Sequence, residues 1–136
     1  MEQTMVTAIL LDNDLKGHGL FIEVGWRETG WAGLLPLDFK LLRDFGLPDD
    51  LPDQEIWRFV QRERLLLVTN NRNREDATSL QATIERENTP TSLPVLTIST
   101  KERLVTPVYR QRVAHSLAAI LLYPEEKLGA GRVFLP

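Results

Sequence analysis

Apolar residues gather in short blocks along this chain, separated by longer amphipathic stretches. Five apolar runs are bounded by polar or turn-forming residues, as expected of strands: residues 7–11, 34–39, 65–69, 94–98 and 132–136. The run over 65–69, "LLLVT", is the clearest of the five. The run over 34–39 is weaker, because Pro36 would remove a ladder hydrogen bond from a central strand.

The stretches between the runs show helical spacing. They predict helices over 15–28, 53–63, 76–87 and 106–123. In the first helix, Leu20, Phe21 and Val24 are expected on the inner face. In the last, Thr106 is expected to act as the cap and Pro107 to lie in the first turn.

Strands that alternate with helices, and that are apolar throughout, are typical of a parallel sheet covered on both faces. The sequence therefore predicts an α/β fold of three layers, α/β/α, with a mostly parallel central sheet of four or five strands. A chain of 136 residues suits a single domain over residues 1–136. In such sheets, ligands bind beyond the C-terminal strand ends, near the point where the strand order reverses.

Composition excludes several classes of function. Cysteine is absent, which excludes disulfides, thiolate zinc sites and cysteine nucleophiles. The two histidines lack a partner at ligand spacing, and no G-x-S-x-G, G-x-x-x-x-G-K-[ST] or G-x-G-x-x-G motif occurs. The net charge of −3 gives no overall attraction for nucleic acid, so binding would need a local basic patch. No apolar run is long enough to span a membrane, and the acidic N-terminus is unlike a signal peptide, so we expect a cytoplasmic protein without membrane contact.

Polar side chains follow the first and third predicted strands. "LLDND" ends the first strand and "VTNNRN" ends the third, so Asp12 and Asn71 would share one edge if these strands are neighbours. Oxygen ligands suit Mg²⁺ or Mn²⁺, which makes Asp12, Asp14, Asp53, Asn71 and Asn73 the candidate metal ligands. For Asp14 and Asp53, an ordinary N-cap role is the favoured alternative, whereas for Asp12 the site interpretation is favoured.

The third strand exit also offers groups for a substrate. Thr69, Asn70 and Arg72 are candidate substrate-binding residues, since amides hydrogen-bond to phosphate and arginine binds it in a bidentate manner. The alternative is a plain turn, because asparagine tolerates left-handed backbone.

Three segments together resemble the short PIN-like domains, a group related to metal-dependent ribonucleases and bacterial toxin nucleases. Those proteins show L-L-D-E-N-L, S-D-E-E-I and L-V-T-x-D-x-D-F in this order. The corresponding segments here are "LLDNDL" (10–15), "PDQEIW" (52–57) and "LVTNNRNR" (67–74). The resemblance covers about the first 80 residues, and the remainder is similar to a narrower, cyanobacterial subgroup.

The resemblance implies roles for individual residues. Asp12 corresponds to the first metal-binding aspartate and Asp53 to the helix-start aspartate, while Asn71 and Asn73 stand where the family has aspartates. Catalysis is then expected at Asp12, Asp53 and Asn71, with Mg²⁺ or Mn²⁺ held weakly, if at all, because two charges are missing.

The implied function is a Mg²⁺- or Mn²⁺-dependent ribonuclease that cuts RNA phosphodiesters with metal-activated water. The alternative is a catalytically inactive PIN-like binding or regulatory domain, and a weaker third option is a nucleotide-binding enzyme of another α/β type. RNA, a second copy of the chain and an antitoxin-like protein are the partners that the resemblance suggests.

Overall fold

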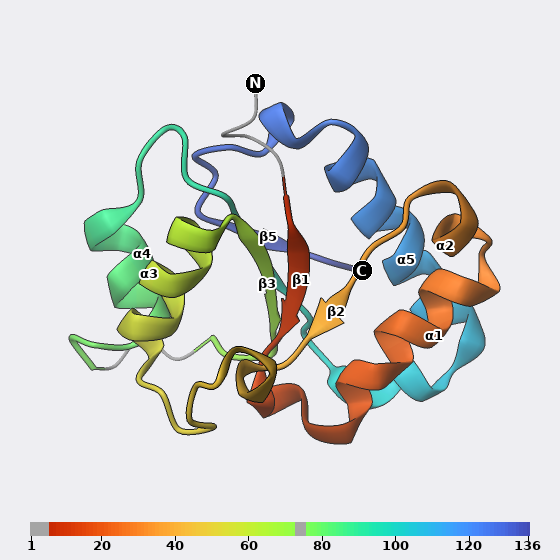
Figure 1. Ribbon diagram of the computed structural model, residues 1–136, viewed down its shortest axis with the longest axis horizontal. Helices are drawn as coiled ribbons and strands as arrows, with labels where there is room; N and C mark the ends of the chain where they lie inside the picture. Colours follow the sequence, from red (N-terminus) through yellow and green to blue (C-terminus); the bar gives the residue numbers. More distant parts are fainter. Residues whose placement is uncertain (1–5, 73–75) are drawn as a thin grey trace.

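The protein forms a three-layer α/β/α fold around a sheet of five parallel strands, in a computed structural model that describes residues 6–72 and 76–136. The strand order is β2-β1-β3-β4-β5. The strands are β1 (Ala8–Leu11), β2 (Phe39–Lys40), β3 (Leu65–Thr69), β4 (Val95–Thr97) and β5 (Arg132–Phe134). The predicted fold class is thus confirmed (Figure 1).

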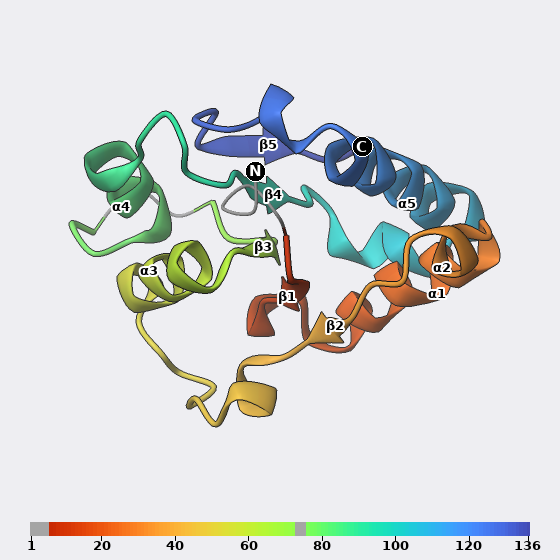
Figure 2. The ribbon, with the colours of Figure 1, turned by 45° about the horizontal axis from the view of Figure 1, so that its top comes forward.

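Helices cover both faces of the sheet (Figure 2). One face carries α1 (Leu20–Glu28), α2 (Trp31–Leu34) and α5 (Pro107–Leu122), and the other carries α3 (Asp53–Glu63) and α4 (Leu80–Glu87). Four 3₁₀ segments complete the described elements: η2 (Asn13–Gly19), η3 (Leu42–Phe45), η4 (Lys101–Val105) and η5 (Pro124–Glu126).

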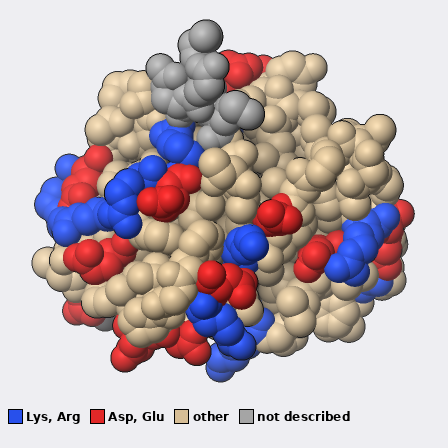
Figure 3. Space-filling model, viewed as in Figure 1, with Lys and Arg blue, Asp and Glu red and all other residues tan. Residues whose placement is uncertain are grey.

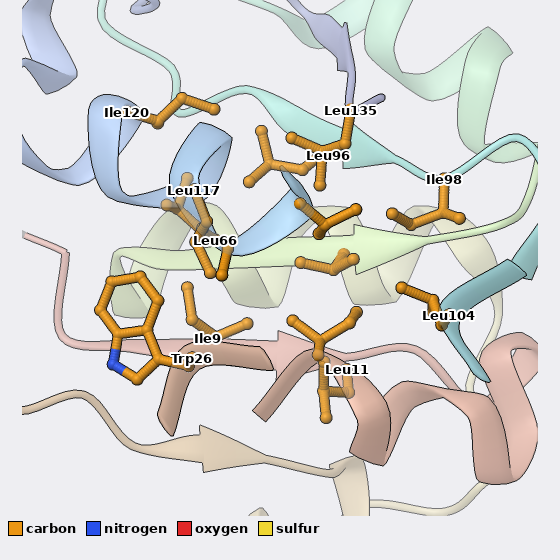
Figure 4. Close-up of a cluster of buried hydrophobic side chains, with 14 of the residues drawn as sticks. Ile9, Leu11, Trp26, Leu66, Leu96, Ile98, Leu104, Leu117, Ile120 and Leu135 are labelled. Atoms are coloured by element: carbon orange, nitrogen blue, oxygen red, sulfur yellow. The ribbon is translucent and has the colours of Figure 1, made fainter. Parts of the chain in front are cut away.

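Alternation along the strands divides the core between the two faces. Ile9 and Leu66 point toward α1 and α5, where Trp26 and Leu117 complete the cluster drawn in Figure 4. The alternate residues of the same strands, such as Leu10, point to the other face and form a second cluster with the apolar sides of α3 and α4. Both faces of β1 and β3 are therefore buried, which is why these strands are apolar throughout.

The strand order reverses between β1 and β3. From β1 the chain moves outward to β2, and from β3 it moves in the opposite direction to β4 and β5. The β3–β4 and β4–β5 connections move across the sheet in the same direction, but the first passes through α4 and the second through α5, on opposite faces (Figure 2). The two crossover connections therefore have opposite handedness. The edge beyond the C-terminal ends of β1 and β3 is the place where such folds bind ligands.

Several predicted boundaries were wrong. The second strand is not residues 34–39 but Phe39–Lys40, with Leu34 in α2, because pairing with β1 and not hydrophobicity decides where this edge strand forms. The first helix begins at Leu20, whose side chain is 58% exposed, so its expected place on the inner face is wrong. Phe21 packs against the core as expected, together with the buried Ile22 and Trp26.

The helix predicted over 76–87 begins at Leu80, after the capping side chain of Ser79. Thr106 occupies the N-cap position of α5 and Pro107 its first turn, as expected, but the Thr106 side chain makes no capping hydrogen bond. In the described parts of the chain, none of the helices has the length and apolar character needed to cross a bilayer.

Candidate functional site at the C-terminal edge of the sheet

The C-terminal ends of β1 and β3 lie side by side, toward the bottom of Figure 1. Leu11 pairs with Val68 in the parallel register, and the Asp12 N–H donates to the Val68 carbonyl at 2.9 Å. Asp12 therefore leaves β1 beside Thr69, the last residue of β3. The expected juxtaposition of the two polar strand exits is confirmed.

The Thr69 hydroxyl lies at the centre of an acidic cluster. Its Oγ1 lies 2.7 Å from Asp12 Oδ2 and 3.2 Å from both carboxylate oxygens of Asp14. The same oxygen accepts the Asn71 N–H at 2.9 Å. A hydroxyl has one proton and can donate to only one carboxylate at a time. The other carboxylate then lies against the Thr69 oxygen with no proton between the two oxygens. An added proton or cation would therefore stabilise the pair of carboxylates.

The electrostatics of the two carboxylates agree with this geometry. Burial and, after it, the charge of Asp14 raise the pKa of Asp12 to about 6, against the hydrogen bond from Thr69. Burial also raises the pKa of Asp14, while the Asn70 N–H at 3.1 Å and the charge of Lys101 act in the opposite direction. Both carboxylates are therefore poorly compensated as anions.

Asp53 joins this edge from the start of α3. Pro52 is the N-cap residue of α3, so the capping role considered for Asp53 is wrong for its own helix. Its Oδ2 instead accepts Asn71 Nδ2 at 3.0 Å and the N–H of Leu80, the first residue of α4, at 3.2 Å. The Asp53 charge also raises the pKa of Asp12 and of Asp14, as the smallest of the contributions to each.

The capping role considered for Asp14 is not what the structure shows either. The Asp14 carboxylate accepts the Asn70 N–H and lies 3.2 Å from the Thr69 hydroxyl, both at the exit of β3. Thr69 itself is fully buried, so its expected substrate-binding role is replaced by that of positioning the two carboxylates. Glu55, which matches the family motif in sequence, lies 3.4 Å from Arg58 and is exposed.

The Asn71 amide changes the chemistry of this edge. An aspartate at this position would face Asp53 with a like charge, and a cation between them would be needed to relieve the repulsion. The amide donates a hydrogen bond to Asp53 instead, so this side is satisfied without a metal. Asn73, the other expected amide ligand, lies outside the described residues.

This edge offers few side chains that could bind a metal ion. Within residues 6–72 and 76–136, no group of three or more histidine, cysteine or acidic side chains is arranged so that it could hold a metal ion. Magnesium, however, is commonly held by one or two carboxylates, with waters and substrate phosphates supplying the other ligands. Asp12 and Asp14 fit that pattern, and the buried Oδ1 of Asn70, without a hydrogen-bond partner in the described part of the chain, is a further oxygen nearby.

A hollow of about 540 Å³ opens beside Asp12. Lys16 and Arg43 contribute cationic groups to its wall, and Leu20 and Leu41 contribute apolar ones. The Lys16 backbone has φ 53° and ψ −142°, an uncommon conformation for a residue with a side chain. Asp49 and Asp50 also line the hollow, so its wall carries charges of both signs, with positive groups in the same wall as Asp12.

Sequence reasoning missed Lys16, Arg43, Lys101 and Arg132. Lys101 follows the exit of β4, and the rule applied to β1 and β3 would have found it there. Arg132 gives no such signal, since it lies at the start of β5. Only the sheet brings its guanidinium to the Asn71 carbonyl at 2.9 Å and to Thr97 Oγ1 at 2.6 Å.

On the face shown in Figure 3, basic and acidic side chains are interspersed without a continuous basic area among the described residues. Comparisons of the chain with protein-family models, with curated proteins and with solved structures found no match. Support for a function therefore comes from the side chains of this edge and from the resemblance of the sequence motifs.

Proposed function

We propose that this protein is a metal-dependent ribonuclease of PIN-like type. The observation that carries the proposal is the pair of carboxylates, Asp12 and Asp14, that share the single hydroxyl of Thr69 at the ligand-binding edge of a parallel sheet. Asp12 and Asp14 are poorly compensated as anions, and Asp12 lines a hollow to which Lys16 and Arg43 contribute beside Asp49 and Asp50, so this edge suits a cation together with a phosphodiester.

The roles follow from the contacts. Asp12 and Asp14 would hold Mg²⁺ or Mn²⁺, and the ion when bound would neutralise charge on the phosphate and acidify water. Thr69 fixes the two carboxylates, and the Asn71–Asp53 hydrogen bond fixes the exit of β3. The satisfied Asp53 leaves only two acidic ligands, so we expect weak metal binding that the substrate phosphate strengthens.

Thermal unfolding with Mn²⁺ tests the metal site. An ion that binds only the folded state with a dissociation constant of about 1 mM would add about 1.4 kcal/mol at about 10 mM, and Asp12→Asn should abolish this shift. The control is Glu126→Gln, an exposed acid on η5, which should keep the wild-type shift. Cleavage of a labelled single-stranded RNA by the wild type and not by Asp12→Asn tests the activity. No Mn²⁺ shift and no cleavage would refute the ribonuclease.

A second function is favoured by one observation. Because Asn71 already satisfies Asp53, this edge holds together without metal, as expected of an inactive binding or regulatory domain with a PIN-like frame. Asn71→Asp combined with Asn73→Asp separates the two. An inert wild type whose double variant cuts RNA would support the inactive domain.

A further inference from the structure

A second hollow lies at the opposite end of the same edge. Its volume is about 590 Å³, and its walls are formed by Arg72, Gln81, Arg132 and Phe134. These residues come from the exit of β3, from α4 and from β5. The roles proposed for Asp12 and Asp14 do not use any of them.

The alternation along β5 explains how Phe134 comes to face this hollow. Val133 and Leu135 pack against the core cluster on the α5 side, so Arg132 and Phe134 point toward the α4 side. There Arg132 Nε donates to Gln81 Oε1 on α4 at 2.8 Å. Phe134 is 57% exposed, whereas the next residue, Leu135, is 5% exposed. The aromatic ring is therefore presented to solvent from a strand whose next residue is buried in the core.

An exposed aromatic residue alone is common on protein surfaces. Here it stands beside Arg72, which is exposed and makes no ion pair with any residue of the described ranges. A ring and a cation in one hollow are what a nucleotide needs, because the base stacks on the ring and the phosphate pairs with the cation.

The hollow is also connected to the acidic site. Arg132 donates to the Asn71 carbonyl, and the Asn71 amide donates to Asp53. Arg72 directly follows Asn71 in the chain. Because β3 and β4 separate β1 from β5, a strand bound with one phosphodiester at Asp12 would place a nucleotide further along the strand, not the adjacent one, in this hollow.

We propose that this hollow is a nucleotide subsite for single-stranded RNA, with the base stacked on Phe134 and the phosphate paired with Arg72. The inference rests on the proposed function, from which it takes the identity of the substrate. Stacking on a ring distinguishes bases poorly, so the subsite adds affinity for unpaired RNA and little sequence preference.

Binding of a fluorescent single-stranded RNA, such as a short oligoadenylate, tests the subsite in EDTA, where metal-dependent cleavage is suppressed. Phe134→Leu should weaken binding about tenfold, since stacking on one ring contributes on that scale. Phe134→Trp should restore it, and RNA should quench the added indole fluorescence. The control is Tyr123→Leu, at the end of α5, because Tyr123 is 56% exposed and α5 runs back toward the opposite edge of the sheet.

The dependence of binding on salt separates the two contacts. Arg72→Ala should reduce the slope of log K against log salt by about 0.7, the value for one phosphate of a single strand, while Phe134→Leu should leave the slope unchanged. Arg62→Ala, on the opposite end of α3 with a side chain 67% exposed, is the charge-matched control and should have little effect.

Wild-type affinity in Phe134→Leu, or no RNA binding in EDTA, would overturn the subsite. Neither result bears on the Mn²⁺ shift or on Asp12-dependent cleavage. The opposite combination is also informative. If RNA binding depends on Phe134, but Mn²⁺ gives no Asp12-dependent shift in thermal unfolding and no cleavage, the subsite is supported and the ribonuclease is refuted.

Discussion

Asp12→Asn should stabilise this protein at neutral pH in the absence of metal. Burial, with the neighbouring charge of Asp14, raises the pKa of Asp12 from 3.8 to about 6, so the folded state disfavours the charged carboxylate. A shift of about two units corresponds to about 3 kcal/mol of stability lost when the group is charged. Asparagine has nearly the same shape and no charge, so it removes this cost.

The dependence on pH has a definite sign. Below pH 3.8, Asp12 is protonated in both states and costs nothing. As the pH rises from there to about 6, the unfolded chain loses its proton first and the folded state loses stability. Above about pH 6, Asp12 is charged in both states and the full loss of stability applies. The free energy of unfolding of the wild type should therefore fall across this window, and that of Asp12→Asn should fall less.

Urea denaturation in EDTA at about pH 5 and about pH 7.5 measures the effect. At the higher pH, we expect the free energy of unfolding of Asp12→Asn to exceed that of the wild type by about 1–3 kcal/mol, because a weaker hydrogen bond with Thr69 offsets part of the benefit. At the lower pH, we expect about half of this difference. Glu126→Gln, an exposed replacement of the same kind, should change little at either pH. A variant less stable than the wild type at about pH 7.5, or an equal difference at both, would show that Asp12 is not destabilised by burial.

Three further substitutions test the packing and the site. Gly25→Ala should cost about 1–3 kcal/mol in urea denaturation, because its Cβ would lie 2.6 Å from the Arg110 carbonyl oxygen where α1 meets α5; unchanged stability would contradict this close contact. Thr69→Val should cost about 1–3 kcal/mol, and more at neutral than at acidic pH, since it removes the proton between the two carboxylates. Asn71→Asp should destabilise the protein in EDTA by a similar amount, because it sets a charge against Asp53, and Mn²⁺ should reverse the loss; a Mn²⁺-independent loss would exclude metal binding there.

Local pattern predicted some elements without error. The helix over residues 53–63 and the strand over 65–69 have the bounds of α3 and β3. The helix has an amphipathic period and follows Pro52, and the strand is buried along its whole length, so local and tertiary preferences agree. The strand of residues 34–39 failed because β2 is an edge strand of two residues, which pairing with β1 places.

The candidate site divides in the same way. Asp12 and the residues after Thr69 could be predicted, because apolar runs that end in polar residues mark the C-terminal ends of parallel strands. That Asp53 would bind the start of α4 and not cap α3 could not be predicted, because its partner Leu80 lies 27 positions away.

The sequence by itself determined the type of fold, the burial of both faces of the central strands, and the edge at which polar groups collect. These features follow from side-chain periodicity, which is a local property of the chain. Only the tertiary structure decided which charges meet: the hydroxyl shared by Asp12 and Asp14, the amide that satisfies Asp53, and the ring of Phe134 beside Arg72. Such contacts depend on strand order and helix placement, and the energy of each is set by burial and distance that no local pattern contains.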